Sequence, residues 1–246
     1  MTIDVREVGA VTVLTLSSGK VNAMDVDLLS DLTSALRELE RTDSTPLVLT
    51  GAGQAFSAGV DLVQVLDGGP DYVGALLAAL SAAFVSVFGF PGPTVAAING
   101  AAIAGGCVLA CACDRRLIAA DGLIGASELR VGVPFPAAAL EILRYACGDH
   151  AEEVMLGGRL YRGADALACR LAQTVVADDL VGQAVAAAAE LGTIPAGSYR
   201  NTKTQLRGPA LSRIAEAALD DEVRQIWASP STAAAIRSHL ERLRRR

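Results

Sequence analysis

Hydrophobic and polar positions alternate near the start of the chain and then change to a helical spacing. In residues 11–16, VTVLTL, alternation of aliphatic residues with threonine predicts a β-strand. In residues 25–41 the aliphatic positions recur three and four apart, which predicts an amphipathic helix. Residues 46–50 predict a buried strand that ends at Gly51. The chain therefore opens with strands and helices in alternation.

The same alternation continues to about residue 150, after which the pattern is mostly helical with one possible strand. The pattern predicts helices at 71–88, 105–111 and 137–146, and strands at 94–98, 115–119, 123–126 and 174–177. Residues 195–246 have helical periodicity and no convincing strand. This order favours an α/β fold, with a core over residues 1–192 and a helical region over residues 193–246.

Length and composition allow one large domain, or a domain with a small appendage. Of the 246 residues, 52 % are hydrophobic, 20 % charged and only 4 % aromatic, so Ala, Val and Leu must fill the core. The net charge of −6 argues against general nucleic-acid binding, which usually needs a basic surface.

Cysteine usage and the apolar stretches indicate a cytoplasmic protein. The five cysteines form no CxxC pair and indicate neither a disulfide framework nor a cysteine zinc motif, so free thiols in a reducing cytoplasm are expected. Residues 95–113 are long enough to raise the question of a membrane span, but Asn99-Gly100 and Gly105-Gly106 interrupt them. We expect a buried strand, a turn and a helix there, and no membrane partner. The start of the chain shows no signal-peptide pattern.

Two glycine-rich turns are the main candidates for chemistry. Residues 97–114, AINGAAIAGGCVLACACD, pass from a strand end through Gly105-Gly106 into a short apolar helix. Glycines at a helix start expose backbone N–H groups that can hold a developing negative oxygen. Residues 50–62, TGAGQAFSAGVDL, supply a second turn of this kind. Convergence of the two turns on one carbonyl oxygen would form an oxyanion site.

Other familiar motifs fail at this point of the chain. The glycines at 51 and 53 are not followed by the third glycine of a dinucleotide fingerprint, because Phe56 stands there, and no P-loop Gly-Lys-Ser/Thr occurs. The segment AFSAG lacks the first glycine of a hydrolase nucleophile elbow. The two histidines, His150 and His239, both fall in segments that we interpret as helical surface.

With so few histidines, a carboxylate is the expected base for any proton chemistry. Glu128 lies among apolar and glycine residues, IGASELRVGVP, where loss of hydration would raise the pKa of a carboxyl. The alternative is an ordinary acid at a helix start after a capping Ser127. The residues alone favour neither interpretation.

The motifs LTGAGQAFSAGVDL and AAINGAAIAGGCVLACACDRRL resemble those of the crotonase, or enoyl-CoA hydratase/isomerase, superfamily. The resemblance implies a core of repeated strand–strand–helix turns and a helical C-terminal trimerisation domain. It implies a homotrimer or a dimer of trimers, acyl-CoA thioester substrates, and no metal or cofactor beyond the coenzyme A of the substrate.

Position in these motifs also assigns site residues. The N–H groups of Ala58 and Gly105 match the family's oxyanion hole, and the segment Ala58, Gly59, Val60, Asp61 matches the part beside coenzyme A. Asp61 is expected to brace the turn. Lys20 lies where the family often contacts coenzyme A, and Lys203 with the terminal arginines is a weaker candidate for its phosphates, the alternative being a solvated helix end.

The departures from the family pattern narrow the expected reaction. Hydratases of the family carry two glutamates, whereas this chain has Val108 at the first position and Glu128 at the second. The pattern Ala-Gly-Gly-Cys-aliphatic, followed by Ile-Gly-x-x-Glu and then Val-Gly-Val-Pro-Phe, is similar to that of the mitochondrial-type Δ3,Δ2-enoyl-CoA isomerases, which use a single glutamate at this place. The resemblance then implies that Glu128 moves a proton from C2 to C4 through a dienolate, with Val108 facing the reacting carbons. Another single-carboxylate activity, such as weak hydration, and a non-catalytic acyl-CoA binder are the alternatives.

Overall fold

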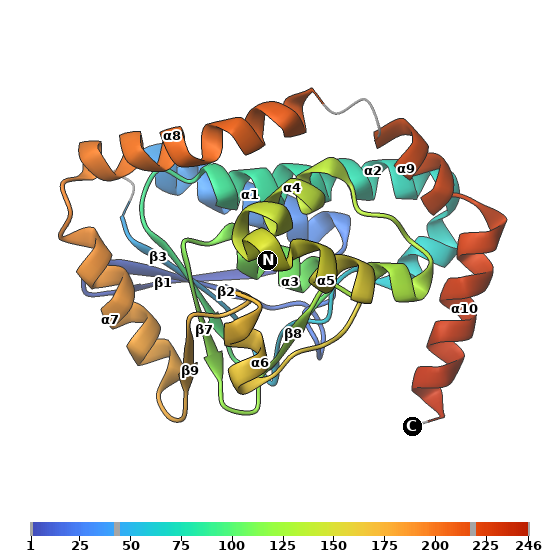
Figure 1. The fold of residues 1–246 in the computed structure, drawn as a ribbon, viewed down its shortest axis with the longest axis horizontal. Helices are drawn as coiled ribbons and strands as arrows, with labels where there is room; N and C mark the ends of the chain where they lie inside the picture. Colours follow the sequence, from blue (N-terminus) through green and yellow to red (C-terminus); the bar gives the residue numbers. More distant parts are fainter. Residues whose placement is uncertain (1, 42–44, 217–219, 246) are drawn as a thin grey trace.

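Nine strands form two sheets in the computed structural model, which describes residues 2–41, 45–216 and 220–245 (Figure 1). The larger sheet has the order β1-β2-β3-β5-β7-β9, with β1 antiparallel to β2 and the other pairs parallel. Its strands are β1 (Ile3–Val8), β2 (Val11–Leu16), β3 (Leu47–Gly51), β5 (Thr94–Ile98), β7 (Arg115–Ala119) and β9 (Thr174–Val176). The smaller parallel sheet comprises β4 (Ala55–Ser57), β6 (Ala101–Ile103) and β8 (Leu123–Gly125).

The chain visits the two sheets in turn. β3, β5 and β7 each lie in the larger sheet, each is followed by a strand of the smaller sheet, and each pair then leads into helical structure. The helices of this part are α1 (Val26–Arg41), α2 (Leu62–Gly89), α3 (Gly105–Ala112) and α4 (Ala137–Cys147), and the short 3-10 helix η1 (Glu128–Val131) lies between β8 and α4. This confirms the α/β fold of repeated strand–strand–helix turns.

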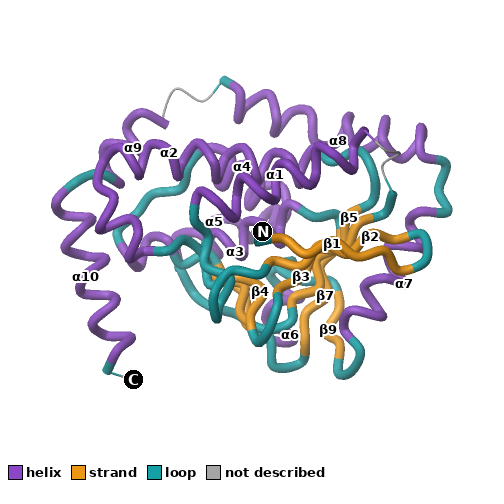
Figure 2. Tube along the Cα trace, turned by 180° about the vertical axis from the view of Figure 1, so that it is seen from behind, coloured by secondary structure: helices purple, strands orange, loops and turns teal. Residues whose placement is uncertain are grey.

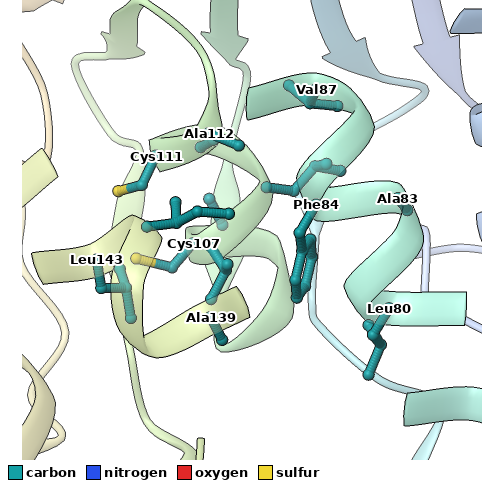
Figure 3. Packing of buried hydrophobic residues seen from close by; sticks show 14 of the residues in the cluster. Leu80, Ala83, Phe84, Val87, Cys107, Cys111, Ala112, Ala139 and Leu143 are labelled. Carbon is teal, nitrogen blue, oxygen red and sulfur yellow. The ribbon is translucent and has the colours of Figure 1, made fainter. Parts of the chain in front are cut away.

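The core lies where α2, α3 and α4 meet. All eight residues of α3 are buried, which explains its composition of glycine, alanine, cysteine and other apolar residues. Figure 3 shows the ring of Phe84 from α2 beside α3, with Leu143 of α4 on the other side of α3. Small side chains let these helices approach closely, so α3 holds a fixed position relative to both sheets.

Helix α2 is longer than the predicted 71–88. It begins at Leu62 and bends at Gly69, which has φ 66° and ψ −163°, directly before Pro70. By length and composition alone α2 could cross a membrane. It packs against α1, α3 and α4 and contributes nine buried side chains to the fold, so its apolar character is explained by a core helix.

The remaining helices cover the sheets and extend beyond the core. They are η2 (Gly148–His150), α5 (Ala151–Gly157), α6 (Gly163–Ala168), α7 (Leu180–Gly192), α8 (Ala196–Ala215), α9 (Asp220–Trp227) and α10 (Pro230–Arg244). Helix α7 packs on the larger sheet, and α8 runs along the side of the molecule that carries α4 and α2 (Figures 1 and 2). Helices α9 and α10 fold back onto α2 and η1. The helical region predicted at 193–246 includes residues 217–219 and 246, which lie outside the described residues.

Candidate active site

The first glycine-rich turn is held by a polar network centred on Asn22. Its side-chain nitrogen donates to the carbonyls of Ala52 (3.0 Å) and Ala55 (2.8 Å). The Ser57 hydroxyl donates to the Asn22 carbonyl (2.7 Å) and accepts a bond from the Gly59 N–H (3.2 Å). Because these groups are buried and satisfied, the backbone after β4 has one defined path.

The two turns meet at Gly59 and Gly105. Gly59 has φ +88°, and a Cβ there would lie 2.8 Å from the Ile103 carbonyl oxygen and 3.4 Å from the Gly105 nitrogen. Only glycine fits this close approach. The expected convergence of segments 50–62 and 97–114 is therefore present in the fold.

The backbone donors at this junction differ from the predicted pair. The Ala58 N–H donates to the Val21 carbonyl (2.9 Å), so the assignment of Ala58 as a free donor is corrected. Within the described part of the chain, the N–H groups of Val60 and Gly105 have no hydrogen-bond acceptor. Both residues line the same pocket. Two residues whose N–H groups are unpaired thus line one pocket.

The strained start of α3 fixes one of these donors. Ala104 has φ 51° and ψ −120°, a conformation that non-glycine residues rarely adopt, and its N–H donates to the Gly125 carbonyl (2.8 Å). This turn places Gly105 at the first position of the helix, where no intrahelical acceptor is available. The positive end of the α3 dipole therefore faces the pocket.

Glu128 faces this pocket with a buried carboxyl group that has one unpaired oxygen. Glu128 is 7 % exposed, and its Oε2 atom has no hydrogen-bond partner among the described atoms. Burial raises the pKa of Glu128 to about 8. Ser127 makes no side-chain capping bond, which argues against the alternative of an ordinary acid at a capped helix start.

Apolar side chains supply most of the pocket wall. Among the lining residues of the described chain, Glu128 is the one carboxylate. Phe84 and Leu80 come from α2, and Trp227 and His239 come from the C-terminal helices. His239 was expected on a helical surface and instead lines the pocket, where burial and the neighbouring Arg242 lower its pKa. No local motif marks these four positions, because segments far apart in sequence bring them together.

The other predicted site residues lie around the pocket. Val108 is fully buried in α3, and its position opposite the reacting carbons stays a prediction. Lys20 is exposed on the turn before Asn22, and its contact with coenzyme A stays a prediction. Gly59 allows the first turn to lie close to the backbone of Gly105. Asp61 caps α2, because its Oδ1 accepts bonds from the N–H groups of Val63 (3.0 Å) and Gln64 (3.1 Å).

Replacing Asp61 with alanine removes both capping bonds and leaves two N–H groups at the start of α2 without their acceptor. We expect a loss of about 1 kcal/mol in the free energy of unfolding. Asp61→Asn, which keeps an acceptor oxygen, should retain most of that stability. Urea unfolding measures both variants, and equal losses would show that the cap contributes nothing specific.

The raised pKa of Glu128 predicts an unusual dependence of stability on pH. The folded state favours the protonated carboxyl, so this stabilisation is complete below the ordinary pKa of 4.5 and is lost as pH rises to about 8. The Glu128→Gln variant carries no titratable carboxyl group at this position. The melting temperature of the variant minus that of the parent should therefore increase across this pH window, as thermal unfolding at several pH values will show. A constant difference would mean that Glu128 titrates normally.

Lys203 is committed to the protein interior rather than to a ligand phosphate. Its Nζ lies 2.9 Å from Asp114 Oδ2 and donates to the Gly92 carbonyl (2.9 Å), while Arg207 pairs with Asp114 Oδ1 (2.7 Å). Burial lowers the pKa of Lys203 to about 8, and the Asp114 carboxylate opposes this shift. The suggestion that Lys203 contacts a phosphate is therefore corrected: it anchors α8 to the core.

Comparison with known proteins identifies the family of this chain. A family model described as enoyl-CoA hydratase/isomerase matches residues 6–244. A probable enoyl-CoA hydratase of Mycobacterium bovis is 30 % identical over 222 residues, covering 89 % of this chain and 86 % of the relative. Human mitochondrial enoyl-CoA delta isomerase 1 is 30 % identical over 210 residues, covering 83 % and 70 %.

Solved structures give the same assignment. The crystal structure of human mitochondrial Δ3-Δ2-enoyl-CoA isomerase matches with a TM-score of 0.92 and 27 % identity, covering 100 % of this chain and 99 % of that chain. Relatives with either activity in their names are equally similar in sequence. The chain therefore belongs to the enoyl-CoA hydratase/isomerase family, the crotonase superfamily.

Proposed function

We propose that this chain is a Δ3,Δ2-enoyl-CoA isomerase that uses Glu128 as its single acid–base group. The observation that carries the proposal is one buried carboxyl group with an unpaired oxygen, in an apolar pocket lined by two residues whose N–H groups are also unpaired. A pKa near 8 suits a group that must both take and return a proton near neutral pH.

The reaction follows from these three groups. With the thioester oxygen between the N–H groups of Val60 and Gly105, the Glu128 carboxylate removes a proton from C2 of a 3-enoyl-CoA. The electron pair delocalises into a dienolate, whose oxygen gains about 3–4 kcal/mol of stabilisation from each donor. Protonated Glu128 then delivers the proton to C4, which leaves the double bond between C2 and C3. The apolar wall excludes the water that would protonate the intermediate at random.

Hydration is disfavoured by the lack of a second carboxylate in the described pocket wall. Addition of water across a double bond requires a water molecule to be oriented and activated, a role for which hydratases of the family use two glutamates. Here the first of those positions is Val108, whose side chain can neither bind nor deprotonate water. The other polar side chains of the described wall are Ser127, His239 and Trp227, whose indole N–H donates to the Pro134 carbonyl.

A pair of substrates tests the assignment. The purified protein should convert 3-hexenoyl-CoA to 2-hexenoyl-CoA and should hydrate crotonyl-CoA slowly by comparison. Both reactions can be followed by the absorbance of the conjugated thioester and confirmed by chromatography of the products. Hydration of crotonyl-CoA at a rate equal to or above isomerisation would reject the isomerase, and binding of both thioesters without turnover would identify a non-catalytic binder.

We also propose that the protein is a cytoplasmic homotrimer or dimer of trimers whose contacts involve the region 193–246. Its support is the family resemblance and the row of helices α8 to α10 outside the two sheets. Light scattering combined with size-exclusion chromatography gives the mass directly. A monomer at micromolar concentration would contradict the proposed assembly.

A further inference from the structure

Outside the pocket, three side chains with different metal-binding atoms lie close together. His150, Glu153 and Cys169 each offer one ligand atom, and these atoms all lie within 4.8 Å of one another. His150 ends η2, Glu153 lies in the first turn of α5, and Cys169 caps the end of α6. The fold thus brings two separate helical segments to one point.

A second feature of this cluster also suggests a ligand. The Tyr161 hydroxyl is fully buried and has no hydrogen-bond partner among the described atoms. It lies against the Cys169 sulfur, and Cys169 itself is 6 % exposed. The neutral Cys169 thiol is only a weak acceptor for this hydroxyl, and a metal-bound thiolate or water beside it would be a stronger one.

We propose that His150, Glu153 and Cys169 bind one Zn²⁺ ion. Zinc accepts this combination of imidazole nitrogen, carboxylate oxygen and thiolate sulfur, whereas Mg²⁺ and Ca²⁺ prefer oxygen ligands alone. A water molecule completes four-coordination and accepts a hydrogen bond from Tyr161. Binding transfers the Cys169 thiol proton to solvent, so affinity increases with pH.

Zinc coordination requires only small movements, and the side chains that must move are exposed. Zinc–ligand distances of about 2.0–2.3 Å place tetrahedral ligand atoms about 3.5 Å apart. The nearest atoms of His150 and Glu153 are 4.0 Å apart, and these side chains are 44 % and 53 % exposed. Arg159, whose guanidinium is 3.9 Å from Glu153 and whose side chain is 60 % exposed, can turn toward solvent. Cys169 can therefore stay in place while its two partners close on the metal.

The site is independent of the proposed isomerase, because none of its three ligands lines the pocket. Its consequence is structural: a metal held by Glu153 and Cys169 connects α5 to α6. Because the ion binds the folded protein, it should raise the melting temperature by mass action.

Cobalt substitution tests the proposal directly. The reduced, chelator-treated full-length protein is titrated with Co²⁺, which gives a thiolate-to-metal charge-transfer band when cysteine is a ligand. We expect one equivalent to bind with this band, Zn²⁺ to displace it, and Mg²⁺ to leave it unchanged. Cys169→Ser should abolish the band, while Cys113→Ser, which changes a buried thiol outside the cluster, should keep it.

The exposed ligands give variants whose folding is not in question. His150→Gln and Glu153→Gln should each weaken Co²⁺ and Zn²⁺ binding at least tenfold and remove most of the zinc-dependent rise in melting temperature. Absence of a charge-transfer band in the parent protein would overturn the proposal. So would a band that persists in Cys169→Ser, or affinities unchanged in both exposed variants.

Discussion

Replacing Glu128 with glutamine should lower kcat/KM for 3-hexenoyl-CoA by about 10³- to 10⁴-fold, because the variant keeps the shape of the side chain and loses the proton acceptor. The change should appear in kcat, since the groups that hold the thioester remain. The parent enzyme needs Glu128 deprotonated, so its kcat/KM should rise with pH and level off above about 8. The residual kcat/KM of the variant should not show this rise with pH.

A second buried glutamate provides the matched control. Glu141 is 4 % exposed, lies on α4 outside the pocket lining, and pairs with Arg144 (2.5 Å) and Arg213 (2.6 Å). Glu141→Gln should lower the melting temperature and leave kcat near the parent value at moderate temperature. Glu128→Gln should instead raise the melting temperature and lower kcat, because it removes a buried carboxyl group that has one unpaired oxygen. Equal losses of activity in both variants would place the effect in folding and would contradict a catalytic Glu128.

Long periodic segments were predictable because their own side chains define the buried face. Helix α1 and strands β2, β3, β5 and β7 appear close to their expected positions. The three-residue strands β4 and β6 were missed, because such a segment is too short for a period and is specified by pairing with its neighbours. The first part of α2 was missed because Gly69 and Pro70 interrupt the periodicity at the bend.

The two glycine-rich turns were predictable from the sequence, and their convergence is present in the fold. The motifs identified the two turns and Glu128, since glycines and an isolated acid are visible in sequence. They did not show that the Ala58 N–H is used by the Val21 carbonyl, because that partner comes from a different segment. For the same reason Trp227 and His239 could not be assigned to the pocket wall before α9 and α10 were placed against α2 and η1.

Gly106→Ala should both destabilise the fold and reduce isomerisation, because this glycine sets the distance between α3 and the first turn. A Cβ at Gly106 would lie 2.3 Å from the backbone oxygen of Ser57 and 3.0 Å from its Cβ. Relief of this clash must move α3 away from β4, which we expect to cost about 1–3 kcal/mol in the free energy of unfolding. The same shift separates the Val60 and Gly105 donors, and a displacement of about 1 Å can reduce kcat/KM by about 100-fold.

Gly74→Ala separates this effect from the general consequence of adding a methyl group to a helical glycine. Gly74 lies within α2, where a Cβ would meet only Arg224 Cδ at 3.9 Å, an ordinary contact. This variant should keep full activity and gain up to about 1 kcal/mol, because alanine is the better helix former. Thermal unfolding and the 3-hexenoyl-CoA assay distinguish the two substitutions. Full activity in a folded Gly106→Ala protein would mean that the spacing of the two turns does not control the reaction, and the proposed pair of donors would have to be abandoned.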